Sequence, residues 1–112
     1  MAKDISIELT DRIERMDALE DRLGIELEAL YAVYKNDGYS SELLVNFDLI
    51  AASGKIDDSL EVNISVYNRN GQLVATKYAY VSKAGFIGFQ SCSQRLDCDE
   101  PPSKIRIYPT VS

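Results

Sequence analysis

The chain has 112 residues, of which 46% are hydrophobic and 27% are charged, and its formal net charge is -6. This composition is that of a soluble globular domain, and it excludes collagen-like, low-complexity and wholly disordered chains. Histidine is absent, which excludes His-containing nucleophilic triads and His-ligated zinc. The acidic balance argues against nucleic acid as a partner, because a phosphate backbone is bound by clustered Lys and Arg.

The sequence predicts no contact with a membrane. No apolar run reaches the ~18 to 20 residues that a spanning helix needs. Asp4 and Glu8 stand where a secretory signal would need an unbroken apolar stretch. We therefore expect a cytoplasmic protein.

The first 40 residues differ from the rest in charge and in period. They hold ten acidic and five basic side chains and no proline. Eight residues follow one another at alternating intervals of four and three, which is the heptad seam of a coiled-coil helix. Glu20 is the only polar member, and one polar residue in a seam usually sets register or partner number. The seam consists of Leu9, Ile13, Met16, Glu20, Leu23, Leu27, Leu30 and Tyr34.

This pattern predicts a helical oligomerisation or docking segment over residues 1–38. The turn-forming cluster Asn36–Gly38 would end it. The spacing does not decide whether the seam pairs with a second copy, most simply in a dimer, or packs on the protein's own sheet, since both bury the same residues. Gly24 leaves another alternative open, in which one helix ends at Arg22–Gly24 and a second runs from Ile25 to Tyr34.

The second segment, residues 39–112, alternates apolar and polar residues with period two. Five strands are predicted, with short connections that suit antiparallel neighbours. The fold class expected is therefore α+β, with an N-terminal amphipathic or coiled-coil helix followed by a mostly antiparallel, five-stranded immunoglobulin-like β-sandwich. The strands are expected at residues 43–51, 60–67, 74–80, 86–92 and 104–111.

The hairpin between the second and third of these strands has a register that can be argued. A two-residue Asn70-Gly71 loop would pair Ile64 with Lys77 and put a cation on the apolar face. A type I turn with Gly71 in the left-handed conformation instead pairs Ile64 with Thr76. We expect the second register, which also turns Tyr78 and Tyr80 toward the core.

One stretch resembles a known family. Residues 64–68, followed by Asn70-Gly71 and residues 72–74, are similar to the FxLYD family of small prokaryotic β-sandwich domains. Ile64, Val66 and Asn68 replace the Phe, Leu and Asp of the name-giving motif, and only the tyrosine, Tyr67, is identical. The similarity covers about residues 43–110. It implies an immunoglobulin-like sandwich without known catalysis, often a module of exported proteins.

Candidate chemical groups are few. The acidic runs Asp57-Asp58 and Asp97–Glu100 lack the spacing of a calcium loop, so we expect solvated turns and no metal site. Cys92 and Cys98 are expected as small, semi-buried thiols, with a bridge that closes a short loop as the alternative. Tyr67 and Tyr108 are expected to face outward, where an amphipathic ring can stack on a sugar or anchor a protein interface.

The sequence therefore predicts a non-catalytic interaction or assembly module without a cofactor. In this interpretation the helix binds a second copy or another protein, and the sandwich is the recognition head, with Tyr67 and Tyr108 as the candidate surface. The alternative is a sandwich that binds a glycan or a metal ion, with the helix packed on its own core.

Overall fold

The computed structural model describes residues 4–112, so the first three residues of the predicted helical segment lie outside the described part of the chain. The elements, in chain order, are β1 (Ile5–Glu8), the 3-10 helix η1 (Thr10–Arg12), β2 (Ile13–Arg15), α1 (Asp17–Arg22), β3 (Glu26–Asn36), β4 (Ser41–Ile50), β5 (Leu60–Tyr67), β6 (Leu73–Val81), β7 (Phe89–Asp97) and β8 (Lys104–Val111).

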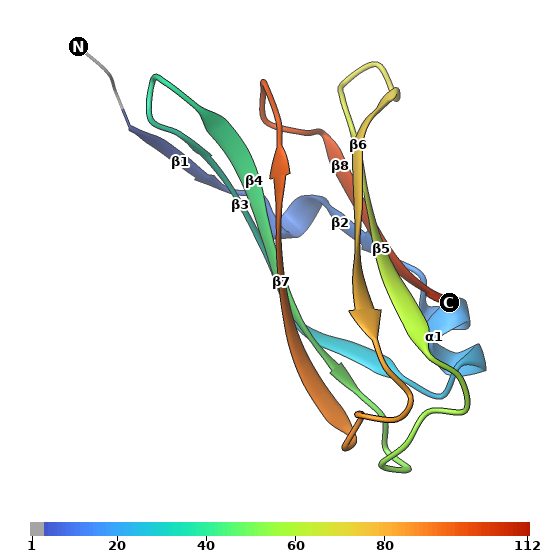
Figure 1. Ribbon diagram of the computed structural model, residues 1–112. Coiled ribbons are helices and arrows are strands. Elements are labelled where there is room, and N and C mark those ends of the chain that lie inside the picture. Colours follow the sequence, from blue (N-terminus) through green and yellow to red (C-terminus); the bar gives the residue numbers. More distant parts are fainter. Residues whose placement is uncertain (1–3) are drawn as a thin grey trace.

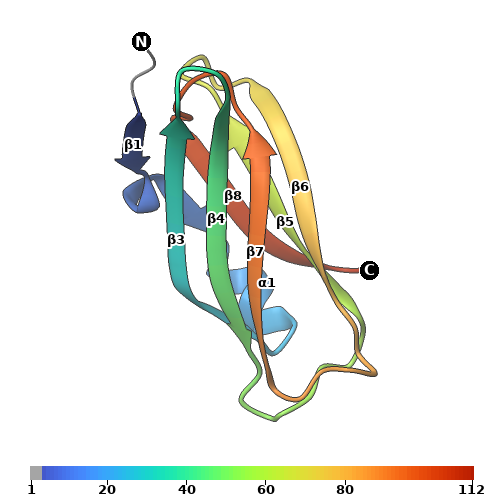
Figure 2. The ribbon, with the colours of Figure 1, turned by 60° about the vertical axis from the view of Figure 1, so that its left-hand side comes forward.

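Two four-stranded sheets form an elongated sandwich (Figure 1). Sheet A has the order β1-β3-β4-β7, and sheet B has the order β2-β8-β5-β6. The strands pair antiparallel except for β2 and β8, which are parallel. Figure 2 shows β3, β4 and β7 in front of β5, β6 and β8, and the apolar core lies between these two layers.

The predicted fold class is wrong. Residues 5–36 contain the three strands β1, β2 and β3 instead of one helix, and the helical structure among residues 4–112 is limited to η1 and α1. The described chain has eight strands, where five were expected. Of the two helical alternatives, only the helix end at Arg22–Gly24 is confirmed, because α1 ends at Arg22 and Gly24 has a φ of 70°.

A bulge in β3 explains why this segment imitates a helix. Residues seven apart in a regular strand lie on opposite faces. Between Glu28 and Tyr31, however, β3 has one residue more than the paired stretch of β4, and Ala29 adopts a φ of 52°. The extra residue brings Leu27 and Tyr34 to the same inward face. The heptad spacing of this stretch therefore belongs to a bulged strand.

The seam residues are nonetheless mostly core residues of a single chain. Leu9, Glu20, Leu27 and Tyr34 are buried, Ile13, Leu23 and Leu30 pack partly buried against the core, and Met16 is exposed. The side chains predicted to face a second helix are thus covered by the protein's own sheets. The predicted helical seam does not form in the described residues, so the prediction of oligomerisation through it is wrong.

Strict alternation predicted β4 and β5 correctly. The inward residues of β4 include Leu43, Val45 and Phe47, all of which are buried. In β5, Leu60 and Val62 are likewise buried, and both strands begin and end within a few residues of the prediction. These are the central strands, where one face packs on the core and the other lies outside.

The predicted register of the β5–β6 hairpin is wrong. Ile64 pairs with Lys77, and the pairing shifts at a bulge between Val66 and Tyr67, although Gly71 has a positive φ of 77°, as expected. The cation is tolerated because β6 is an edge strand. The Lys77 side chain reaches past the edge, and its Nζ donates to the carbonyl oxygen of Arg95 on β7 at 3.0 Å. A lysine in this position also hinders pairing with a further strand.

A buried ion pair joins the two sheets beside α1. Glu20 is 2% exposed, and its Oε1 lies 2.6 Å from Nη2 of Arg15 on β2. The same carboxylate oxygen accepts from the backbone N–H of Leu27 on β3 at 3.0 Å, and Arg15 Nη2 donates to the Leu27 carbonyl at 2.6 Å. The hydrogen bond to Glu20 raises the pKa of the Arg15 guanidinium. Glu20, which the sequence analysis expected to set the register of a helical seam, thus connects sheet B to sheet A.

Glu20→Ala is expected to lower the free energy of unfolding by about 2 kcal/mol, because the Leu27 N–H loses its acceptor and Arg15 keeps only Asp17 and the Leu27 carbonyl as partners. The loss stays below that of a fully buried pair, since the Arg15 side chain is 35% exposed. Urea unfolding followed by circular dichroism measures it. Asp21→Ala, at an exposed position of the same helix, is the control and should change stability by less than about 0.5 kcal/mol. Equal stability of the two variants would contradict the role of Glu20.

Candidate functional site

Three tyrosines gather on the outer face of sheet B. Tyr78 on β6 and Tyr108 on β8 both pair with Asn63 on the intervening β5, so these three side chains share one face. Tyr80 is two residues further along β6 and points the same way. Tyr78 is 55% and Tyr80 is 53% exposed, whereas Tyr108 is half-buried. We call Tyr78, Tyr80 and Tyr108, together with the neighbouring Asn63, Ser65 and Thr76, the tyrosine face.

The tyrosine face is hollowed. An open hollow of about 670 Å³ is lined by its six residues together with Ile64 and Lys77. The small residues Ser65 and Thr76 are paired with each other in the row next to Tyr78, Asn63 and Tyr108, on the side away from Tyr80, and they leave the surface low there. Ser65 is 7% exposed and lies deepest. The tyrosine rings and the small polar side chains beside them form a shallow depression in the surface.

Asn63 has a fixed orientation at the centre of this face. Its Nδ2 donates to Thr110 Oγ1 at 2.9 Å and to the carbonyl oxygen of Tyr108 at 3.4 Å. A carbonyl can only accept, so the amide nitrogen must point toward β8. In the part of the chain that the structure describes, Oδ1 of Asn63 is then the atom left to accept a hydrogen bond from a ligand.

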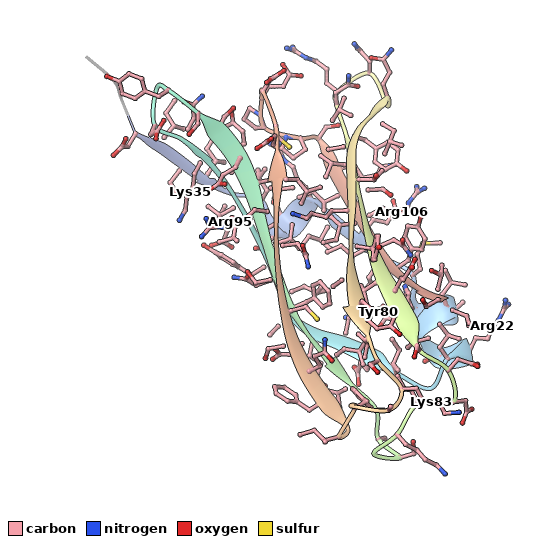
Figure 3. The ribbon with its side chains drawn as sticks, viewed as in Figure 1. Arg22, Lys35, Tyr80, Lys83, Arg95 and Arg106 are labelled. Atoms are coloured by element: carbon pink, nitrogen blue, oxygen red, sulfur yellow. The ribbon has the colours of Figure 1, made fainter. Side chains whose placement is uncertain are left out.

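The neighbouring cations of sheet B, Lys104 and Arg106, share one carboxylate partner. Arg106 Nε donates to Oε1 of Glu14 on β2 at 2.7 Å, and Lys104 Nζ lies 3.8 Å from the same carboxylate. The hydrogen bond to Glu14 raises the pKa of Arg106. Lys104 and Arg106 also lie over the ring of Tyr67, at 5.5 Å and 5.4 Å from its centroid. Figure 3 shows Arg106 on the far side of the sandwich from Lys35 and Arg95.

The structure divides the two tyrosines that the sequence singled out. Tyr108 belongs to the hollow, whereas Tyr67 is half-buried under Lys104 and Arg106 and does not line it. Sequence reasoning missed Tyr78 and Tyr80, which it had assigned to the core. Both faces of β6 carry apolar residues, so the alternation alone could not choose between them. Ala79 and Val81 fill the core instead.

The acidic runs do not form a metal site in the described structure. Asp57, Asp58, Asp97, Asp99 and Glu100 are all exposed. Among residues 4–112, no group of three or more His, Cys, Asp or Glu side chains is placed to hold a metal ion. These carboxylates are exposed to solvent, in loops and, for Asp97, at the end of β7.

The two cysteines are free and buried. Burial raises the pKa of the Cys98 thiol to about 11, and it also raises the pKa of Cys92. A thiol is a nucleophile only as the thiolate, so neither group is activated at neutral pH. The disulfide considered as an alternative is not formed in this structure.

Native Cys98 should react slowly with iodoacetamide. With the pKa at about 11 instead of 9.0, the thiolate fraction at pH 8 falls about 100-fold relative to the unfolded chain. Because the folded pKa is raised, the stability that the protonated thiol contributes is fully present below pH 9.0 and is lost as the pH rises toward about 11. Mass spectrometry after timed alkylation, with and without urea, measures the rates. Equal rates in the two states would contradict burial of the thiol.

Comparisons with protein-family models, with curated proteins and with solved structures found no match to this chain. In the described residues, no helix is long and apolar enough to cross a membrane.

Proposed function

We propose that this protein is a non-catalytic recognition domain that binds its ligand on the tyrosine face. The observation that carries the proposal is the exposure of Tyr78 and Tyr80 beside Tyr108, around a hollow with a small polar floor. A half-exposed tyrosine offers apolar ring area and a hydroxyl at low conformational cost, which is why tyrosine is frequent where proteins contact ligands and partners.

The position of the rings supports this proposal over a purely structural role. The core beneath β6 is filled by Ala79 and Val81, which are 4% and 0% exposed. Tyr78 and Tyr80 therefore do not close the sandwich. Tyr67, in contrast, is engaged by two cations and serves the fold.

The chemistry of the hollow supports binding without catalysis. Its polar groups are an amide, two small hydroxyls, phenols and Lys77, whose Nζ is held by the Arg95 carbonyl. Acid–base catalysis needs a group that titrates near the working pH, and covalent catalysis needs an activated nucleophile such as a thiolate. In the described part of the chain, neither a carboxylate nor a thiol lines the hollow. The resemblance to the FxLYD family, which implies a sandwich without known catalysis, agrees with this proposal.

Arrays of glycans and of synthetic peptides test the proposed face without assuming a ligand class. Ligands that bind the intact chain should lose at least about tenfold in affinity for the double variant Tyr78→Ala, Tyr80→Ala, the effect of removing central aromatic contacts. Tyr39→Ala removes a tyrosine that is 89% exposed on the β3–β4 turn and should bind like the unmodified protein.

Circular dichroism should show the same sheet content for all three proteins, because the substituted side chains are more than half exposed. The proposal fails if the double variant retains every ligand that the intact chain binds, or if no array ligand binds the intact chain.

A further inference from the structure

The cations beside the tyrosine face are already held by protein oxygens. Arg106 and Lys104 are bound to Glu14, and the Lys77 ammonium is held at β7 by the Arg95 carbonyl. Glu61, which pairs with Tyr80 and Thr110, is the carboxylate beside the hollow. The chain as a whole carries a net charge of -6. Among the described residues, an anionic ligand would therefore have to displace the protein partner of each cation, against the repulsion of Glu61 and of the net charge of the chain.

The groups left to contact a ligand are neutral and rich in hydroxyls. Oδ1 of Asn63 is an oriented acceptor, and Ser65, Thr76 and the phenols supply groups that both donate and accept. The flat faces of the tyrosines supply apolar area beside these polar atoms. A ligand that matches both features has apolar C–H faces and many neutral hydroxyls, which is the chemistry of a sugar ring.

The strand spacing gives the length of ligand that this face can use. Tyr78 and Tyr108 are paired with Asn63 from opposite sides, so their backbones are about 10 Å apart, two inter-strand spacings. Tyr80 lies about 7 Å from Tyr78 along β6. One sugar ring cannot cover Tyr78 and Tyr108 together, whereas a short chain that runs across the strands over Asn63 can.

We infer that the ligand of the tyrosine face is a neutral oligosaccharide that lies across β6, β5 and β8, with rings against Tyr78 and Tyr108 and hydroxyls on Asn63. This inference rests on the proposed function and adds the class of ligand and its direction on the sheet. A second copy of the chain fits less well, since the edge of sheet B at β6 carries Lys77 and the described face has no row of apolar side chains.

Titration of the ¹⁵N-labelled full chain tests the inference. The probes are cellohexaose, maltohexaose, xylohexaose and chitohexaose as neutral chains, hexagalacturonate as an anionic chain, and glucose, xylose and N-acetylglucosamine as single rings. At least one neutral hexaose should shift the amide signals of Asn63, Ser65 and Thr76 in a saturable way. Its affinity should be at least about tenfold above that of its own monosaccharide and should not change between low and high salt.

Variants assign the contacts. Tyr78→Ala and Tyr108→Ala should each lower the affinity by roughly tenfold, while Tyr78→Phe, which keeps the ring, should lose much less. Tyr39→Ala is the matched control and should bind normally. Tyr108 is half-buried, so if Tyr108→Ala does not fold, the contrast between Tyr78→Ala and Tyr78→Phe decides the outcome.

The inference is overturned if hexagalacturonate binds more tightly than every neutral chain, or if the shifts fall on residues outside the tyrosine face. It is also overturned if a peptide from the arrays binds this face while all the sugars fail, and in that case the proposed function stands. If neither peptide nor sugar reaches the face, both proposals fall.

Discussion

The contact among Arg15, Glu20 and Leu27 is the constraint on which the arrangement of the two sheets depends. Arg15 comes from β2 in sheet B, Leu27 comes from β3 in sheet A, and the Glu20 carboxylate is bound to both. A buried carboxylate is costly unless its charge and lone pairs are satisfied, so these groups hold their places together. Since β2 pairs with β8, the contact also positions the sheet that carries the tyrosine face.

At the opposite side of the sandwich, the edge strands β6 and β7 are joined by hydrogen bonds from side chains. Lys77 of β6 reaches the Arg95 carbonyl, and Gln90 of β7 donates to the Tyr80 carbonyl at 3.2 Å. These contacts let β6 place a lysine on its inward side and Tyr78 and Tyr80 on its outer side. The candidate site therefore depends on the register of β6, which can place Lys77 inward only because β6 is an edge strand.

Much of the fold could be predicted where a strand is regular and central. β4 and β5 have one apolar face, and any other register would expose it to water. The first segment could not be predicted in this way, because the bulge at Ala29 shifts the period of β3 and puts Leu27 and Tyr34 on the same face. Of the candidate site, Tyr108 was predicted, whereas Tyr78 and Tyr80 were missed, since both faces of β6 are partly apolar.

The sequence by itself determined that most of the apolar residues of the regular pattern, including Leu9, Leu27 and Tyr34, are buried, because the cost of exposing an apolar side chain to water is set by the side chain. It also determined the turn at Gly71, where a positive φ is needed. Only the tertiary structure decided that the first segment is strand and that Tyr78 and Tyr80 lie outside. Bulges, edges and ion pairs such as that of Arg15 with Glu20 are defined by a partner far along the chain, and local periodicity contains no information about that partner.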